Sequence, residues 1–358
     1  MTDSEPTVAK AWNTASTVRT GEQLPDKPLS AYLAHLFGRS EPIAIDQFRG
    51  GHSNLTYLIR FGDDELVLRR PPFGSTVATA HDMSREYRVL NALAPHYDKA
   101  PRVFGYCDDS SIIGAPFYLM ERVPGLIIRR DVPQHLEFNE QIASNLSKTL
   151  IDTLVGLHKL DYSAIGLADL GKPIGYVERQ VRGWTQRYDR SKTTEITEAT
   201  AVAEWLANNQ PTGNRRVALI HNDFKFDNLV LDPNGLHTVN GILDWEMSTI
   251  GDPWMDLGTS LCYWVQDSDP DELKAIAFGP TTRPGMWTRQ QLLDRYAELS
   301  GTSVKNPAFF YVFGLFKLAV VVQQIYFRYV NGHTRDPRFA KLGHVAMVLL
   351  RHAHTNID

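Results

Sequence analysis

Residues 221–228 read His-Asn-Asp-Phe-Lys-Phe-Asp-Asn, and Asp244 follows sixteen positions after the last of them, in the context Ile-Leu-Asp-Trp-Glu. A short apolar strand at 217–220 leads into this stretch, and an apolar hairpin ends at Asp244. An Asp, an Asn and a second Asp at this spacing are typical of a site that transfers a phosphoryl group from a nucleotide. We therefore interpret 221–228 as a catalytic loop.

The polar residues of this stretch suit the needs of phosphoryl transfer, which are positioning and positive charge near the phosphates. Asp223 can accept the proton of an attacking hydroxyl, and Lys225 can steady the transferring phosphate. Magnesium prefers oxygen ligands and keeps several waters, so the Asn228 amide and the Asp244 carboxylate are enough to hold it. Any one of these residues could simply cap a local turn. Their joint pattern predicts ATP and Mg²⁺ as ligands.

The composition limits the class of protein. The chain has 358 residues, of which 43% are hydrophobic, so it can bury a large core. Its formal net charge of −4 gives no basic field for nucleic acid, and we expect no nucleic-acid partner. Cys107 and Cys262 are far apart and read as free thiols, and residues 1–27 lack an apolar signal core. We therefore expect a cytoplasmic protein; the sequence does not reveal its oligomeric state.

The order of predicted elements indicates two lobes. Residues 1–27 read as a flexible arm, and most of the strands predicted in the chain fall between residues 28 and 123. Pro124-Gly125 breaks the pattern, and mainly helical periodicity fills residues 124–358. Strands and helices segregated in this way predict an α+β protein, with a small antiparallel-sheet N-lobe, a mainly helical C-lobe and a cleft between them.

Residues 309–330 form the most apolar stretch of the chain. Lys317, Gln323 and Arg328 interrupt it. A membrane span needs about 20 predominantly apolar residues. We therefore predict a buried core helix here and no membrane partner.

Taken together, these motifs resemble those of the aminoglycoside phosphotransferase (APH) family of small-molecule kinases, which share the bilobal protein-kinase-like fold. Residues 221–223 are similar to the family's His-Gly-Asp, with Asn222 in place of the usual Gly, and 243–246 match the segment that carries its metal-binding Asp. Residues 251–257 match the segment that braces the catalytic loop. The resemblance covers about residues 48–263. It implies supporting roles for His221, Asp252 and Asp256.

The resemblance also implies a nucleotide site in the N-lobe. A Gly-rich turn would cover the phosphates, and a cation on the third strand would contact them. That cation is Arg69, where the family usually has Lys, and Glu86 on the following helix matches its ion-pair partner. Residues 119–123 resemble the hinge whose backbone binds adenine, and Glu121 and Val123 are therefore candidate nucleotide-binding residues. The predicted turn comprises Gly50, Gly51, Ser53 and Asn54.

Several stretches resemble a narrower group, the kinase-like domain fused ahead of some acyl-CoA dehydrogenases, which is linked to phosphorylation of hydroxylated acyl-CoA esters. These stretches are residues 19–22, 48–51, 171–173, 178–180 and 245–253. Aromatic residues such as Trp184, together with Arg179, Arg182 and Arg187, suit an anionic or acyl acceptor better than a polycationic aminoglycoside. The same residues could equally be helical core and a solvated helix face.

We therefore predict an ATP-dependent phosphotransferase that acts on a hydroxyl of a small molecule, with a hydroxyacyl-CoA as one candidate. An aminoglycoside or amino-alcohol kinase is an alternative. A kinase-fold protein that binds nucleotide with little or no turnover is another, because Arg69 and Asn222 depart from the family pattern. A protein kinase fits less well, because no Ala-Pro-Glu segment follows Asp244.

Overall fold

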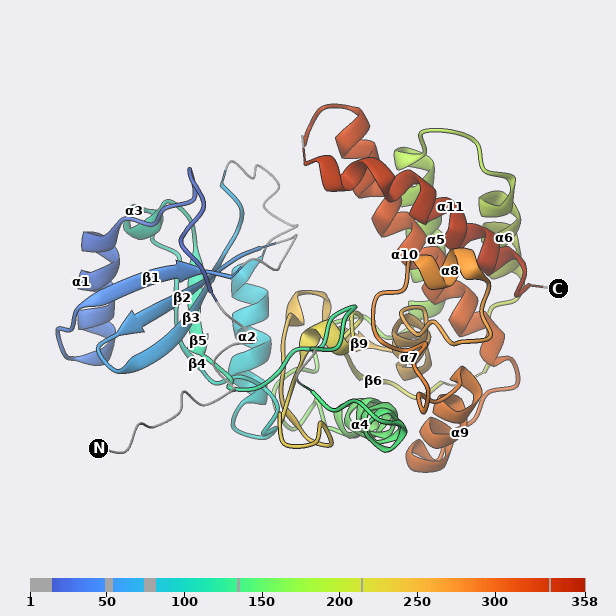
Figure 1. The fold of residues 1–358 in the computed structure, drawn as a ribbon, viewed down its shortest axis with the longest axis horizontal. Helices are drawn as coiled ribbons and strands as arrows, with labels where there is room; N and C mark the ends of the chain where they lie inside the picture. The colour runs from blue at the N-terminus through green and yellow to red at the C-terminus, as the bar shows by residue number, and fades with distance from the viewer. Residues whose placement is uncertain are drawn as a thin grey trace. The chain divides into compact units, whose positions relative to one another are not determined.

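The computed structural model describes residues 15–48, 54–73, 82–133, 136–213, 215–334 and 336–357. The chain forms two compact units (Figure 1). Unit 1 comprises Met1–Ile127 and Asn228–Glu246, and unit 2 comprises Ile128–Asp227 and Met247–Asp358. The sequence predicted one boundary, after Val123, and assigned residues 228–246 to the C-lobe. In the structure this hairpin belongs to unit 1, because Leu126 and Leu231 exchange backbone hydrogen bonds.

Unit 1 is built on a five-stranded antiparallel sheet with the order β1-β2-β3-β5-β4. Two helices cover opposite faces of it, because Tyr32 of α1 packs on Phe117 while Tyr87 of α2 packs on the adjacent strand residue, Tyr118. The strands are β1 (Ile43–Gln47), β2 (Leu55–Phe61), β3 (Asp64–Arg70), β4 (Val103–Cys107) and β5 (Phe117–Glu121), and the helices are α1 (Asp26–Phe37), α2 (Met83–Leu93) and α3 (Ser110–Ile113). The hairpin of β7 (Leu229–Leu231) and β8 (Val239–Ile242) completes this unit, whose last residue, Glu246, lies in the short helix η3 (Trp245–Met247).

The predicted flexible arm is ordered where it is described. Ser16 pairs with Gln47 as an isolated β-bridge, and the Tyr57 hydroxyl donates to the Glu22 carbonyl over 2.8 Å. Leu24 is buried in the same core as the sheet. Residues 15–25 are therefore fastened to β1 and β2, because backbone pairing and a buried Leu outweigh their polar composition.

Unit 2 is mainly helical, as predicted. Strands β6 (Ala218–Ile220) and β9 (Thr249–Gly251) form a short antiparallel pair. The catalytic loop follows β6, and helix α7 follows β9. The helices are α4 (Glu140–His158), α5 (Tyr176–Ser191), α6 (Thr197–Asn208), α7 (Pro253–Leu261), α8 (Asp271–Ala275), α9 (Arg289–Ser300), α10 (Pro307–Val330) and α11 (Leu342–His354), with short helices η2 (Phe226–Asn228) and η4 (Pro337–Lys341). The structure therefore has the predicted α+β, protein-kinase-like fold class.

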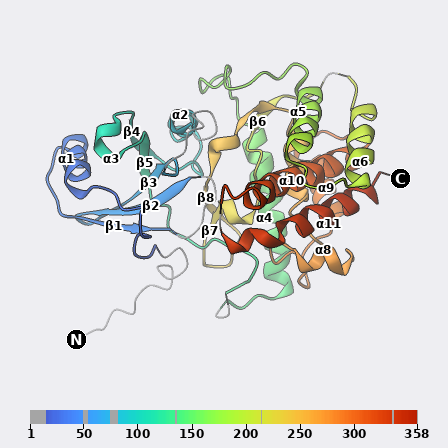
Figure 2. The same cartoon turned by 90° about the horizontal axis from the view of Figure 1, so that it is seen from above.

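Helix α10 is the central element of unit 2. By length and composition alone it could cross a membrane, but 78% of its most apolar window is buried inside the protein. It contacts α5, α6, α7 and α11, and Figure 2 shows it running beside α11. The predicted core helix is confirmed in this position, where its apolar side chains meet other helices rather than solvent.

Candidate active site

Asp223, the predicted base, lies in the loop after β6, and two neighbours orient its carboxylate. The Lys225 ammonium lies 3.0 and 2.8 Å from its two oxygens. The Tyr263 hydroxyl donates to Oδ1 over 2.8 Å, and the Lys225 ammonium also lies 4.7 Å from the centre of the Tyr263 ring. The sequence motifs did not single out Tyr263. Its position at the end of α7, close to the loop that α7 braces, was the signal that could have marked it.

Asn222 occupies the position where the family usually has Gly, and its backbone explains the preference. Its φ is +65°, in the left-handed region that disfavours most side chains. Asn tolerates this region, and here its side chain is also used: Oδ1 accepts from the Tyr176 hydroxyl over 3.2 Å, and Nδ2 donates to the Met247 carbonyl over 3.1 Å. The substitution therefore preserves the turn that the loop needs.

The predicted brace of the catalytic loop, Asp256 in α7, is in place and fully buried. Its carboxylate accepts from the backbone N–H groups of His221 and Asn222 over 2.8 and 2.7 Å, and it lies 3.0 Å from His158 Nε2. Burial alone would raise the pKa of Asp256, but these donors hold it below its usual value. The loop backbone is thus fixed by a carboxylate that stays charged.

His221 supports the loop from inside. Its ring is buried, and Nδ1 accepts from the backbone N–H of Asp223 over 3.3 Å, which assigns the ring proton to Nε2. This contact orients the loop directly at Asp223.

Asp252, by contrast, is the N-cap residue of helix α7. It accepts from the Trp254 N–H at the start of α7 over 2.9 Å, and it pairs with Arg215. Its support of the loop is therefore indirect, through the position of α7.

The predicted nucleotide cation, Arg69 on β3, forms the expected ion pair. It lies 3.0 Å from Glu86 of α2, and its second terminal nitrogen donates to Asp244 over 2.9 Å. Both Arg69 and Glu86 are buried. Burial favours the uncharged guanidine, but the negative charges of Glu86 and Asp244 raise the pKa of Arg69 well above its usual value, so the cation persists.

Asn228 and Asp244, the predicted metal ligands, meet at one end of the β7–β8 hairpin. Leu229 pairs with Ile242, and the Leu243 N–H donates to the Asn228 carbonyl over 2.8 Å, so Asn228 lies just before the paired residues and Asp244 just after them. Asp244 has φ +66°, a second non-Gly residue in the left-handed region. One amide and one carboxylate oxygen suit Mg²⁺, which takes its other ligands from water and phosphate. These residues fit the predicted ion.

Of the predicted phosphate-binding turn, Gly50, Gly51 and Ser53 lie outside the described residues. Asn54 is buried at the start of β2, and its Nδ2 donates to Glu246 over 2.7 Å. At the predicted hinge, the Glu121 N–H donates to the Arg102 carbonyl over 2.8 Å, and Val123 packs against Gly241. Both hinge residues therefore contact their own unit, and their predicted adenine contacts remain predictions.

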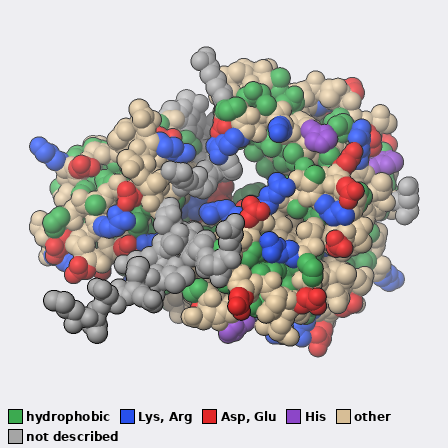
Figure 3. Space-filling view, in the orientation of Figure 1, with side chains coloured by type: hydrophobic (Ala, Val, Ile, Leu, Met, Phe, Trp, Pro, Cys, Tyr) green, Lys and Arg blue, Asp and Glu red, His purple; other side chains and the backbone are tan. Residues whose placement is uncertain are grey.

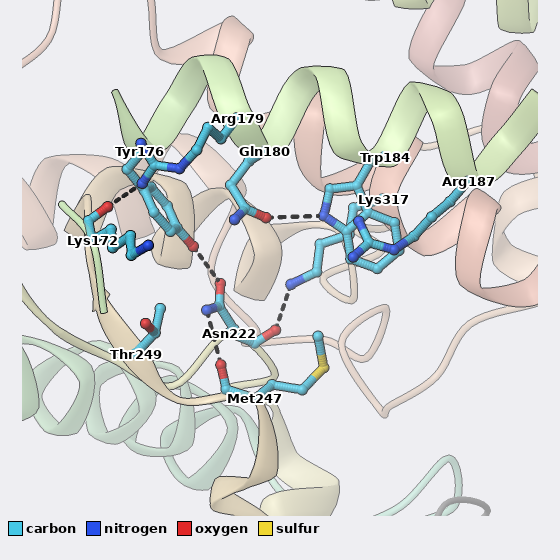
Figure 4. Close-up of a pocket in the computed structure, with 10 residues that line it drawn as sticks. All are labelled: Lys172, Tyr176, Arg179, Gln180, Trp184, Arg187, Asn222, Met247, Thr249 and Lys317. Atoms are coloured by element: carbon cyan, nitrogen blue, oxygen red, sulfur yellow. Dashed lines mark hydrogen bonds between the residues drawn. The ribbon is translucent and has the colours of Figure 1, made fainter. Parts of the chain in front are cut away.

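A pocket of about 320 Å³ lies beside Asn222 in unit 2 (Figure 4). Two of the three arginines that the sequence associated with the acceptor, Arg179 and Arg187, line it. The third, Arg182, lines a different groove, between α5 and α6, because it faces away on the same helix. The lining comprises Lys172, Tyr176, Arg179, Gln180, Trp184, Arg187, Asn222, Met247, Thr249 and Lys317.

The fold and these side-chain sets define a bilobal, protein-kinase-like small-molecule phosphotransferase. The model of the phosphotransferase enzyme family, APH, matches residues 44–294, and the chain belongs to this family. Acyl-CoA dehydrogenase family member 10 of Mus musculus is 35% identical over 319 residues, which make up 88% of this chain and 29% of that protein. The chain thus spans less than a third of that relative.

Two solved structures illustrate the fold. A putative aminoglycoside phosphotransferase from Ralstonia eutropha JMP134 has a TM-score of 0.79 and 27% identity, covering 94% of this chain and 98% of its own. The GDP and kanamycin complex of APH(2″)-IIIa has a TM-score of 0.61, with coverages of 91% and 98%. At 15% identity, the second likeness concerns the fold alone.

Proposed function

We propose that this chain transfers a phosphoryl group from ATP to a hydroxyl group of a small molecule. The observation that carries the proposal is the Asp223 carboxylate, which Lys225 and Tyr263 orient on a loop fixed by Asp256. A carboxylate held in this way suits the abstraction of a proton from an attacking hydroxyl.

Unit 1 supplies the residues proposed for the nucleotide. Arg69 would contact phosphate oxygens, and Glu86 and Asp244 keep its guanidinium charged. A magnesium ion held by Asn228 and Asp244 would offset the charge of the phosphates. GDP in the APH(2″)-IIIa complex supports nucleotide binding by this fold. Lys225 is the second cation proposed to steady the phosphoryl group.

For the acceptor we propose an anionic hydroxyl compound, with a hydroxylated acyl-CoA ester as the leading candidate. The similarity to acyl-CoA dehydrogenase family member 10 supports an acyl-CoA ester. The pocket beside Asn222 supports an anion, because four cationic side chains and no carboxylate line it. A polycationic aminoglycoside would be repelled there, so an aminoglycoside kinase is the weaker alternative.

The acceptor proposal is tested by measuring nucleotide consumption with three groups of compounds: hydroxyacyl-CoA esters, aminoglycosides and amino alcohols. We expect turnover with at least one hydroxyacyl-CoA, and product that carries one added phosphate by mass. Turnover only with the cationic compounds would contradict the acceptor class. Nucleotide binding without turnover on any compound would favour a nucleotide-binding protein instead.

A further inference from the structure

The pocket beside Asn222 has an unusual charge balance. Its cations are contributed by the loop before α5, by α5 itself and by α10 (Figure 4). On the visible surface of the protein, in contrast, Lys and Arg are interspersed with Asp and Glu (Figure 3). Four like charges around one cavity repel one another, which makes the cavity a favourable place for an anion. The cations are Lys172, Arg179, Arg187 and Lys317.

None of these four cations forms an ion pair with a carboxylate in the described part of the chain. Arg179 donates to the carbonyls of Lys172 and Ile174, which holds its guanidinium without neutralising it. Elsewhere in unit 2, Arg289 and Arg295 are paired with Asp269 and Asp152. Lys172, Arg179 and Arg187 thus keep their charge available to a ligand, whereas burial lowers the pKa of Lys317.

Two of the cations are held by Trp184. The Arg187 guanidinium lies 4.7 Å from the centre of the indole ring, and the Lys317 ammonium lies 5.7 Å from it. Trp184 itself is buried, and its indole N–H donates to Gln180 over 3.2 Å. The ring therefore positions both charges before any ligand arrives, which lowers the entropy cost of binding.

Lys317 connects the pocket to the catalytic loop. It is 5% exposed, although it lies in the apolar helix α10, and its ammonium donates to the carbonyl of Asn222 over 2.7 Å. Asn222 immediately precedes the proposed base, Asp223. A side chain that lines the pocket thus also fixes the loop that carries the proposed base.

We propose that this pocket binds a phosphate group carried by the acceptor. Phosphate is favoured because two arginines and two lysines can surround several oxygens of one dianion, and Arg matches phosphate geometry with paired donors. That the bound compound is the phosphoryl acceptor rests on the proposed function. Binding of phosphate to the pocket can be tested without turnover. The nucleotide's own phosphates are the competing source of the same chemistry.

The test uses the full chain, inorganic pyrophosphate as the probe and isothermal titration calorimetry. ADP is present at saturation, so that nucleotide phosphates occupy their own site, and magnesium is omitted because it would complex the probe. The pocket variant is the double substitution Lys172→Gln with Arg187→Gln. Arg182→Gln is the matched control, because it removes one charge from the same helix α5 but from the other groove.

We expect the wild-type chain and Arg182→Gln to bind pyrophosphate with affinities within about twofold, because charges outside the pocket contribute little. The double variant should bind on the order of ten- to hundred-fold more weakly, because it loses two charge-assisted contacts. Equal binding by all three proteins would overturn the proposal, as would wild-type binding that appears only when ADP is left out. Absence of measurable binding to wild type would overturn it too.

This test separates the two proposals. Pyrophosphate binding that depends on Lys172 and Arg187, combined with no turnover on any acceptor, would reject the kinase proposal and retain the anion site. Turnover on a neutral hydroxyl compound, combined with variant-independent binding, would retain the kinase and reject the site.

Discussion

At the scale of single residues, Asn222 shows how the catalytic loop keeps an unusual backbone without glycine. Its φ of +65° is held by a side chain that bonds Tyr176 and Met247, and by a backbone that bonds Asp256 and Lys317. The loop therefore combines a strained conformation with four tethers, an arrangement common at functional sites.

Substitutions at Asn222 should separate these two contributions. In Asn222→Ala, the left-handed backbone costs about 1–2 kcal/mol, and two lost hydrogen bonds cost about 1 kcal/mol each. Asn222→Gly loses the same hydrogen bonds but relieves the strain, so it should be the more stable variant. Urea denaturation measures the difference. An Ala variant as stable as the Gly variant would show that the backbone strain is unimportant.

Tyr263 is the residue we expect to position the base. Tyr263→Phe keeps the ring near Lys225 and removes only the hydroxyl that donates to Asp223. A hydrogen bond to a charged group is worth about 1.5–3 kcal/mol, so kcat should fall on the order of tenfold or more while the KM for nucleotide stays nearly constant. Tyr311→Phe, which removes a buried hydroxyl 2.9 Å from His352 Nε2, is the control for general loss of packing. An unchanged kcat in Tyr263→Phe would remove this role.

At the scale of elements, the crossing of α7 and α10 depends on two glycines. A Cβ on Gly258 would lie 2.2 Å from the Phe310 carbonyl oxygen, and a Cβ on Gly314 would lie 2.2 Å from the Gly258 carbonyl oxygen. The backbones therefore approach at these points too closely for any other residue. Helix α7 carries Asp256 and α10 carries Lys317, so this crossing sets both supports of the catalytic loop.

Gly314→Ala should destabilise the protein, because the obstacle is backbone that cannot rotate away. Overpacking a core typically costs about 1–3 kcal/mol, and thermal unfolding measures the loss. Gly156→Ala is the matched control: Gly156 lies within α4, and nothing is within 4 Å of the added Cβ. That control should be neutral or stabilising by about 0.5–1 kcal/mol. Equal stability of the two variants would contradict the close crossing.

The sequence predicted these elements well because hydrophobic periodicity and turn residues are local signals. Residues 309–330 were predicted as a buried core helix and lie within α10. The Arg69–Glu86 pair was also predicted, from the resemblance to the family. The contacts of Tyr263 with Asp223 and of Lys317 with Asn222 were not predictable. They join residues 40 and 95 positions apart, respectively, and depend on how the helices cross. The position of Arg182 on another groove was not predictable either, because helix faces cannot be assigned to a pocket without the fold.

At the scale of the whole molecule, the proposed function divides between the two units. Unit 1 contains Arg69, Asn228 and Asp244, whereas unit 2 contains Asp223 and the cationic pocket. A ligand that binds only the folded chain adds RT ln(1 + [L]/Kd) to its stability, about 2.7 kcal/mol at a hundredfold excess over Kd. Nucleotide binding should therefore be visible in the unfolding of the chain.

Asp244→Ala should weaken this linkage. The substitution removes a proposed magnesium ligand and one partner of Arg69. We expect magnesium and an ATP analogue to raise the melting temperature of wild type by several degrees and of the variant by much less. Leu243→Ala is unsuitable as a control because it alters the hairpin, so Asp46→Ala, on β1 and paired with Arg60, is used instead. An equal increase in both variants would exclude Asp244 from the metal site.

The central claim is that Asp223 is the base of a phosphoryl transfer, and the Asp223→Asn variant tests it most directly. Phosphoryl transfer is measured with the acceptor found by the screen, and nucleotide affinity is measured by calorimetry on the same preparation. A positioned base contributes about 10²–10⁴-fold, so we predict a fall in kcat of that order with nucleotide affinity nearly unchanged. Transfer by the variant at the wild-type rate would contradict the account.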